Sequence, residues 1–162
     1  MKFTLSWLYE HLDTKADIKI IESTLTNIGL EVESIENRAD EFKSFTVAKI
    51  IDVSEHPNAD RLKVCIVETI KGNFQVVCGA PNAKIGMLGI FAPENSYIPG
   101  TKVKLKKSKI RGIESCGMLV SEKEMGISDE HEGIIEINQK YKVGDSFSKI
   151  YGLNDPIIEI NI

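Results

Sequence analysis

Apolar residues recur along this chain at two spacings, and the change from one to the other falls near residue 40. Before that point, isoleucine and leucine recur every three or four positions over residues 20–28, which is the spacing of one helix face. Thr14 is the predicted N-cap of this helix, Asp17 lies in its first turn, and Gly29 supplies a left-handed stop at its end. The pattern therefore predicts one amphipathic helix in the first part of the chain.

Shorter elements flank this helix. The chain opens with an apolar strand over residues 2–5 and a helix over residues 6–12, for which Ser6 is the predicted N-cap. Residues 30–35 alternate apolar and acidic side chains, which is typical of a strand with one solvated face. These elements form a small α+β unit that is incomplete by itself, and the polar residues 37–44 are the predicted connector to the rest of the chain.

From residue 45 onward the chain is rich in β-branched residues and is interrupted by turn sequences. Five short strands within about a hundred residues predict a small closed barrel, and the OB-fold is a common nucleic-acid-binding barrel of that size. A last strand is expected within residues 154–162, where the chain stops in mid-element, so we expect the natural polypeptide to be longer. The five strand candidates are residues 45–53, 61–70, 73–80, 87–93 and 132–137.

Composition limits the class of protein. The chain has 162 residues, of which 42% are apolar and 27% are charged, a balance typical of a globular protein with a hydrophobic core. Its apolar runs are too short to span a membrane, and its first residues lack the pattern of a signal peptide. The three cysteines form no CxxC pair, so reduced and buried thiols are expected. We therefore expect a cytoplasmic protein without membrane contact.

Charge changes this picture most over residues 102–111, which we call the basic segment. It holds six cations and no acid, although the whole chain has a formal charge of −4; the remaining residues carry 14 cations and 24 acids, a formal charge of −10. A positive stripe on an acidic protein favours binding to a phosphate backbone. As one strand, the segment would place Val103 and Leu105 on the face opposite its lysines. The alternative is a solvated strand edge whose lysines prevent edge pairing.

Two further segments add candidate contacts. Residues 56–67, HPNADRLKVCIV, form a predicted turn with Arg61 at its exit, where a guanidinium could meet a phosphate; the alternative is a purely rigid loop. Residues 111–126, RGIESCGMLVSEKEMG, combine glycines with Ser115 and Ser121, whose hydroxyls could donate to a phosphate. The alternative for this second segment is a tight crossover between a strand and a helix.

The residue types of a catalytic or metal site are present but poorly arranged. His56, Asp60 and Cys78 are the types found in thiolate catalysis, but Cys78 ends an apolar run and is predicted to be a core thiol. The three histidines are far apart, no Cys/His spacing matches a zinc site, and no phosphate-binding glycine motif occurs. We therefore predict no catalytic residue, no metal site and no bound cofactor in this chain.

Three motifs, taken in order, resemble one module. HPNADRLKVCIV, VVCGAPN and IRGIESCGMLVSEKEMGI together resemble the EMAP-type tRNA-binding OB module, over residues 45 to about 150. The opening MKFTLSWLYEHLD and the following IESTLTNIGLEVESIE resemble the start of the bacterial phenylalanyl-tRNA synthetase β-subunit family. In that family the chain returns to its first domain after the OB insertion. The resemblance implies an α+β fold, with a small α/β domain at residues 1–39 plus 151–162 and a five-stranded OB-fold tRNA-binding domain at residues 40–150.

The resemblance also implies a function. It is that of a non-catalytic part of the phenylalanine–tRNA ligase beta subunit, with phenylalanine-accepting tRNA, the catalytic α subunit and the rest of the β subunit as partners in a heterotetramer. ATP and Mg²⁺ would serve the holoenzyme and not this chain. Few aromatic residues are available for base stacking, so recognition would be electrostatic and by shape. The alternatives are an assembly module with solvated lysines and an independent tRNA chaperone. The predicted nucleic-acid-binding residues are Arg61, Lys104, Lys106, Lys107, Lys109, Arg111, Ser115 and Ser121.

Overall fold

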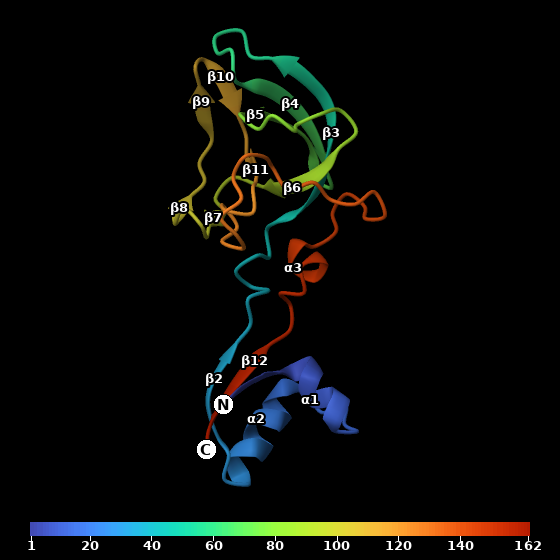
Figure 1. Ribbon diagram of the computed structural model, residues 1–162, viewed down its shortest axis with the longest axis vertical. Helices are drawn as coiled ribbons and strands as arrows, with labels where there is room; N and C mark the ends of the chain where they lie inside the picture. Colours follow the sequence, from blue (N-terminus) through green and yellow to red (C-terminus); the bar gives the residue numbers. More distant parts are fainter. The chain divides into compact units, whose positions relative to one another are not determined.

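The computed structural model describes all 162 residues, and the chain forms two compact units. Unit 1 consists of Met1–Phe42 together with Ser148–Ile162, and unit 2 is the intervening Lys43–Phe147. The predicted α+β class is confirmed, with a small helix-bearing unit and a five-stranded antiparallel sheet that is nearly closed into a barrel (Figure 1). No helix of the structure is long and apolar enough to cross a membrane.

Unit 1 is built on a three-stranded antiparallel sheet in the order β1-β12-β2. The strand predicted near the end of the chain is confirmed as β12, which pairs with both strands of the opening segment. Buried isoleucines of β12 and α2 pack with Phe3 in the core of this unit, and Gly29 ends α2 with a φ of +96° as predicted. The elements are β1 (Lys2–Thr4), α1 (Leu5–His11), α2 (Ile18–Asn27), β2 (Glu31–Glu36), α3 (Phe147–Ile150) and β12 (Ile157–Asn161).

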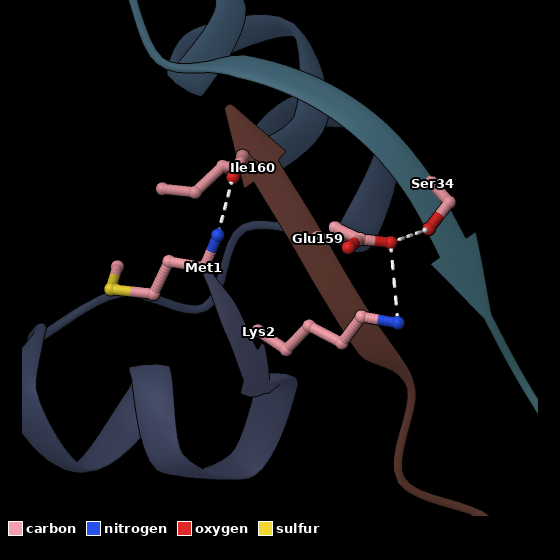
Figure 2. A network of polar contacts seen from close by, with 5 residues as sticks. All are labelled: Met1, Lys2, Ser34, Glu159 and Ile160. Carbon is pink, nitrogen blue, oxygen red and sulfur yellow. Dashed lines mark hydrogen bonds and ion pairs between the residues drawn. The ribbon is translucent and has the colours of Figure 1, made fainter. Parts of the chain in front are cut away.

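Polar contacts on this sheet reinforce the pairing of β12 (Figure 2). The amino group of Met1 donates to the carbonyl oxygen of Ile160 at 2.7 Å. The carboxylate of Glu159 accepts a hydrogen bond from the Ser34 hydroxyl at 3.1 Å and pairs with the Lys2 ammonium at 3.3 Å. Lys2 and Ser34 lower the pKa of Glu159, so this carboxylate joins β1 and β2 to the central strand in its ionised form.

The N-cap predicted for the first helix is wrong by two residues. Thr4 is the N-cap of α1, and its hydroxyl accepts a hydrogen bond from the Trp7 amide at 3.3 Å. Ser6 lies inside the helix, where its amide (3.0 Å) and its hydroxyl both donate to the carboxylate of Asp155. Partial burial opposes ionisation of Asp155, but these hydrogen bonds outweigh it and lower the pKa. Asp155 thus places a negative charge beside the first turn of α1, where exposed amides favour it.

The N-cap predicted for the second helix is also wrong. Asp17 is the N-cap of α2, and its carboxylate accepts hydrogen bonds from the amides of Lys19 and Ile20 at 2.9 and 3.0 Å. The hydroxyl of Thr14 instead accepts a hydrogen bond from the Ala16 amide at 3.1 Å, in a turn that precedes the helix. Both residue types are good caps, and Asp17 takes the position because α2 begins at Ile18, directly after it, and its first turn leads to Ile21, the buried residue of the helix.

Unit 2 is an antiparallel barrel in the order β11-β6-β3-β4-β5. The residues just before β11 contact the other edge strand, β5: the Cys116 amide donates to the Gln75 carbonyl at 2.8 Å, and the Val77 amide donates to the Ser115 hydroxyl at 3.0 Å. Alternate residues of β3, β4 and β5 fill the interior. The strands are β3 (Thr46–Glu55), β4 (Lys63–Thr69), β5 (Gly72–Cys78), β6 (Leu88–Ala92), β7 (Tyr97–Ile98), β8 (Val103–Lys104), β9 (Ser108–Ile110), β10 (Ile113–Ser115) and β11 (Met118–Leu119).

The strand predicted over residues 132–137 does not form, and the fifth strand of the barrel is β11 instead. Only an isolated bridge joins Ile137 to Leu88. The side-chain amide of Asn82 occupies the polar groups that a neighbouring strand would use: it accepts from the Ile134 amide at 3.0 Å and donates to the Ile134 carbonyl at 2.8 Å. The isoleucines of this segment are buried as the alternation predicts, but no continuous ladder forms: Asn82 holds the backbone of Ile134, and only the amides of Ile135 and Ile137 donate to backbone carbonyls, at 2.9 and 2.8 Å.

Candidate nucleic-acid interface

The basic segment, residues 102–111, does not form the single strand that its alternation suggests. It contributes to two separate hairpins, in which β8 pairs with β7 and β9 pairs with β10. The prediction that Val103 and Leu105 share one face of a single strand is wrong: Val103 lies in β8 and is 57% exposed, whereas Leu105 follows that strand and is half-buried. The direction of the chain changes at Lys102, whose φ is +56°. The six cations are therefore distributed over two hairpins and the link between them.

Arg111 lies at the tip of the β9–β10 hairpin. The turn between the paired residues Ile110 and Ile113 consists of Arg111 and Gly112, with φ values of +48° and +89°. Positive φ at both turn positions is the geometry of a type I′ hairpin, which suits the twist of the adjoining strands. The left-handed backbone costs an arginine about 1 kcal/mol or more, so interactions elsewhere must hold this turn. The Arg111 side chain is exposed at the tip.

The loop between β3 and β4 holds this tip. His56 is 5% exposed, and its Nδ1 accepts a hydrogen bond from the Asn58 amide at 3.0 Å. The proton of a neutral ring is then on Nε2, which donates to the Ile110 carbonyl at 2.9 Å. The side-chain nitrogen of Asn58 donates to the Arg111 carbonyl at 3.2 Å. The structure thus brings the loop of Arg61 and the hairpin of Arg111 to one end of the barrel (Figure 1). Sequence reasoning missed this role of His56 and Asn58.

One of the six cations has an acidic partner. The ammonium of Lys107 forms an ion pair with the carboxylate of Glu114 on β10, and this contact lowers the pKa of Glu114. The thiol of Cys116 also donates to that carboxylate at 3.5 Å. No carboxylate lies within 4.0 Å of the nitrogen atoms of the other five cations, or of Arg61. The exposed cations that form no ion pair are Arg61, Lys102, Lys104, Lys106, Lys109 and Arg111.

The acidity of the chain is concentrated in the unit that lacks these cations. Unit 1 contains 5 cations and 11 acids, a formal charge of −6, whereas unit 2 contains 15 cations and 13 acids, a formal charge of +2. The barrel is therefore positive even though the whole chain has a charge of −4. Its electrostatic potential favours a polyanion on the face that carries the basic segment.

The two predicted serines lie inside the fold. Ser115 is 4% exposed, accepts from the Val77 amide, and donates to the Gly117 carbonyl at 3.4 Å. Ser121 is 6% exposed, and its hydroxyl donates to the carboxylate of Glu124 at 3.0 Å. Both hydroxyls have internal partners that stabilise the strand ends. Their predicted contact with a phosphate would require those hydrogen bonds to open, unlike the contacts of the exposed cations.

The buried thiols are unsuited to catalysis. Burial raises the pKa of Cys65 to about 11 and also raises the pKa of Cys78, so both thiols stay protonated and poorly nucleophilic near neutral pH. His56 bonds to backbone groups through both ring nitrogens, which leaves it no free nitrogen to act as a base toward Cys78. The chain contains no group of three or more His, Cys, Asp and Glu side chains placed to hold a metal ion.

Comparison with known proteins identifies the barrel. The family described as "Putative tRNA binding domain" matches residues 45–146, which includes the loop of Arg61 and the whole basic segment. The chain belongs to this tRNA-binding domain family. Its match covers the strands of the barrel from β3 to β11.

Relatives that match the whole chain confirm the predicted relationship to the phenylalanine–tRNA ligase beta subunit. The chain is 51% identical to the phenylalanine–tRNA ligase beta subunits of Brucella abortus and Rickettsia bellii, over 100% of its length and 20% and 19% of theirs. It therefore spans about a fifth of the length of the curated relatives it matches. A solved MetRS-related protein from Pyrococcus horikoshii has 22% identity and a TM-score of 0.47, over 67% of this chain and 94% of that one.

Proposed function

We propose that this chain is a non-catalytic, tRNA-binding part of a phenylalanine–tRNA ligase beta subunit, and that the face of the barrel carrying the basic segment contacts the tRNA phosphates. The observation that supports this most is the concentration of exposed cations without acidic partners on the positively charged unit of an acidic chain. The proposed phosphate contacts are Arg61, Lys104, Lys106, Lys109 and Arg111. Lys107 contributes less because Glu114 neutralises it.

The proposed mechanism is electrostatic. Lysine and arginine side chains that neutralise phosphates release condensed counterions, and this release drives binding with little dependence on base sequence. Cations on two hairpins and on the β3–β4 loop would follow a curved backbone rather than a straight one. The arrangement therefore suits the folded surface of a tRNA, recognised by shape and charge.

The proposed partners are those that the resemblance to the phenylalanyl-tRNA synthetase β-subunit family implies. The substrate is phenylalanine-accepting tRNA, and the chain acts within a longer beta subunit that joins the catalytic α subunit in a heterotetramer. ATP and Mg²⁺ serve the ligase reaction, for which this chain supplies no catalytic residue. Its role is to hold the tRNA while the reaction takes place elsewhere in the enzyme.

A second candidate function, assembly, rests on unit 1. The groove between α1 and α2 is lined by apolar side chains, of which Leu12, Ile20 and Ile28 are 50%, 54% and 68% exposed. Large exposed apolar side chains gathered in one groove are typical of an interaction surface. The proposed occupant is another domain of the same beta subunit, because the curated relatives are about five times as long as this chain. This function uses unit 1 and is compatible with tRNA binding by unit 2.

The test is a titration of the chain with phenylalanine-accepting tRNA at about 50 and about 200 mM salt, a range over which binding through phosphate contacts weakens steeply. We expect binding at the lower salt that weakens steeply at the higher salt. Ile20→Gln with Ile28→Gln serves as a control that alters the groove of unit 1 without changing the net charge, and its tRNA affinity should stay within about twofold of the wild-type value. An absence of binding at the lower salt would refute the tRNA proposal and favour the assembly function.

A further inference from the structure

We infer that His56 and Asn58 are positioning residues: they fix the tip of the β9–β10 hairpin so that Arg111 and Lys109 meet the tRNA backbone in a preset geometry. This inference rests on the proposed tRNA-binding function. It assigns a role to the HPN sequence at the start of the β3–β4 loop, where no side chain itself needs to touch the tRNA. We call the contacts of His56 and Asn58 with Ile110 and Arg111 the latch.

The first contact of the latch is a buried imidazole that uses both nitrogens. Nδ1 of His56 accepts from the Asn58 amide, which closes the loop locally, and Nε2 donates across to the Ile110 carbonyl at 2.9 Å, 54 residues away in sequence. Because the ring is 5% exposed, water does not readily replace either hydrogen bond. The local bond orients the ring, and the second bond transmits that orientation to the hairpin.

The second contact fixes the next carbonyl along the hairpin. The side-chain nitrogen of Asn58 donates to the Arg111 carbonyl at 3.2 Å, so two consecutive carbonyl groups at the start of the turn are held from the same loop. The backbone at Arg111 has a φ of +48°, a conformation that an arginine adopts rarely without support. The latch thus lies where the backbone most needs stabilisation.

The hairpin needs such support because it is short. β9 and β10 have three residues each, and an isolated two-stranded hairpin of this size is marginally stable in water. In the middle of β10 the Glu114 carbonyl accepts from the side chain of Gln75 at 2.7 Å, and just beyond the base of the hairpin the Cys116 amide donates to the Gln75 carbonyl at 2.8 Å. At its tip, the latch supplies the hydrogen bonds from outside the hairpin. Without the latch, the cations near the tip would have to be ordered when tRNA binds, and affinity would fall.

Two substitutions of His56 separate the local bond from the latch. In His56→Gln, the side-chain nitrogen reaches about as far as Nε2 and still donates to Ile110. In His56→Asn, the shorter side chain replaces only Nδ1 and leaves the Ile110 carbonyl without its partner. We expect His56→Gln to bind phenylalanine-accepting tRNA within about twofold of the wild type, and His56→Asn to bind about five- to tenfold more weakly at about 50 mM salt.

A double-mutant cycle tests whether the effect passes through Arg111. Asn58→Ala removes the second contact, and we expect it to weaken tRNA binding about threefold in the wild type but by a clearly smaller factor when Arg111→Ala is already present, because Lys109 is then the one proposed contact that the latch still positions. The matched control is Asn82→Ala. Asn82 also joins two backbone groups across the barrel, but it holds the segment of Ile134 and not the hairpin. Asn82→Ala should lower the Tm without changing the tRNA affinity of the folded protein.

The outcomes are distinguishable. If the wild type shows no salt-dependent binding, the proposed function fails, and the positioning role fails with it. If the wild type binds and His56→Asn binds as tightly as His56→Gln, only the positioning role is refuted. Hydrogen exchange gives a readout without tRNA: amides of residues 112 and 113 should exchange faster in His56→Asn than in His56→Gln, and equal rates would overturn the latch. Should both His56 variants fail to fold, the double-mutant cycle still tests the inference: additive effects of Asn58→Ala and Arg111→Ala on the tRNA affinity would overturn it.

Discussion

Neutralising three cations of the basic segment should flatten the salt dependence of tRNA binding by a calculable amount. Each phosphate contact contributes about −0.9 to the slope of log K against log salt concentration. The five proposed contacts give a slope of about −4.5, so a fourfold rise in salt should weaken wild-type binding about 500-fold. Replacing Lys104, Lys106 and Lys109 by Gln leaves two contacts and a slope of about −1.8, so the same rise should weaken binding only about 12-fold.

The assay is a set of titrations with phenylalanine-accepting tRNA at four salt concentrations between about 50 and about 200 mM. The control replaces Lys71, Lys140 and Lys142 by Gln. This triple variant has the same net charge and changes the same unit, but its substitutions lie outside the basic segment. Its slope should stay near the wild-type value. Equal slopes for the two triple variants would show that net charge, and not the position of the basic segment, determines binding, and would refute the reasoning.

Single side chains give three further predictions. Glu114→Gln frees the cation that it neutralises and should tighten tRNA binding and steepen the salt slope by about 0.9; an unchanged slope in the same titrations would contradict this. Gly117→Ala should destabilise the chain by about 3 kcal/mol in urea unfolding, because a Cβ there would lie 2.5 Å from the Phe91 ring and the φ is +92°. Gly86→Ala has a similar φ of +87° but no atom within 4 Å of the added Cβ, so it should cost about 1 kcal/mol. Equal losses of stability in the two variants would exclude the steric explanation. Asp155 has a lowered pKa in the folded state, so its contribution to stability is present above its unfolded pKa of about 3.9 and is lost as the pH falls through the folded pKa. Asp155→Asn should therefore flatten the pH dependence of Tm below about pH 4. An unchanged dependence of Tm on pH in this range would contradict the stabilising role of ionised Asp155.

Much of the fold could be predicted from the sequence because the strands of unit 2 are strongly patterned. The alternation and turn sequences place β3 to β6 close to their observed bounds. The helix caps were harder to place, since Thr14 and Asp17 are both good caps and only the packing of α2 decides between them. The segment at residues 132–137 could not be placed from local pattern. The side chain that occupies the backbone of Ile134 lies 52 residues away in sequence.

The candidate site could be predicted only in part. The charge of the basic segment is visible in the sequence, but its division into two hairpins depends on positive φ at Lys102 and Arg111, residue types that rarely adopt it. The one available signal is the Arg–Gly pair between Ile110 and Ile113, which resembles a two-residue hairpin turn. The latch could not be predicted from the sequence, because a histidine in a turn gives no indication of which distant carbonyl it donates to.

The most direct test of the proposed tRNA-binding surface is a lysine footprint of the chain with and without phenylalanine-accepting tRNA. Acetylation of each lysine is measured by mass spectrometry at low salt. We expect tRNA to protect Lys104, Lys106 and Lys109, while Lys15 and Lys19 of unit 1 react at the same rate with and without it. Protection of the unit 1 lysines with an unprotected basic segment would contradict the proposal, because the tRNA would then be bound by a different surface.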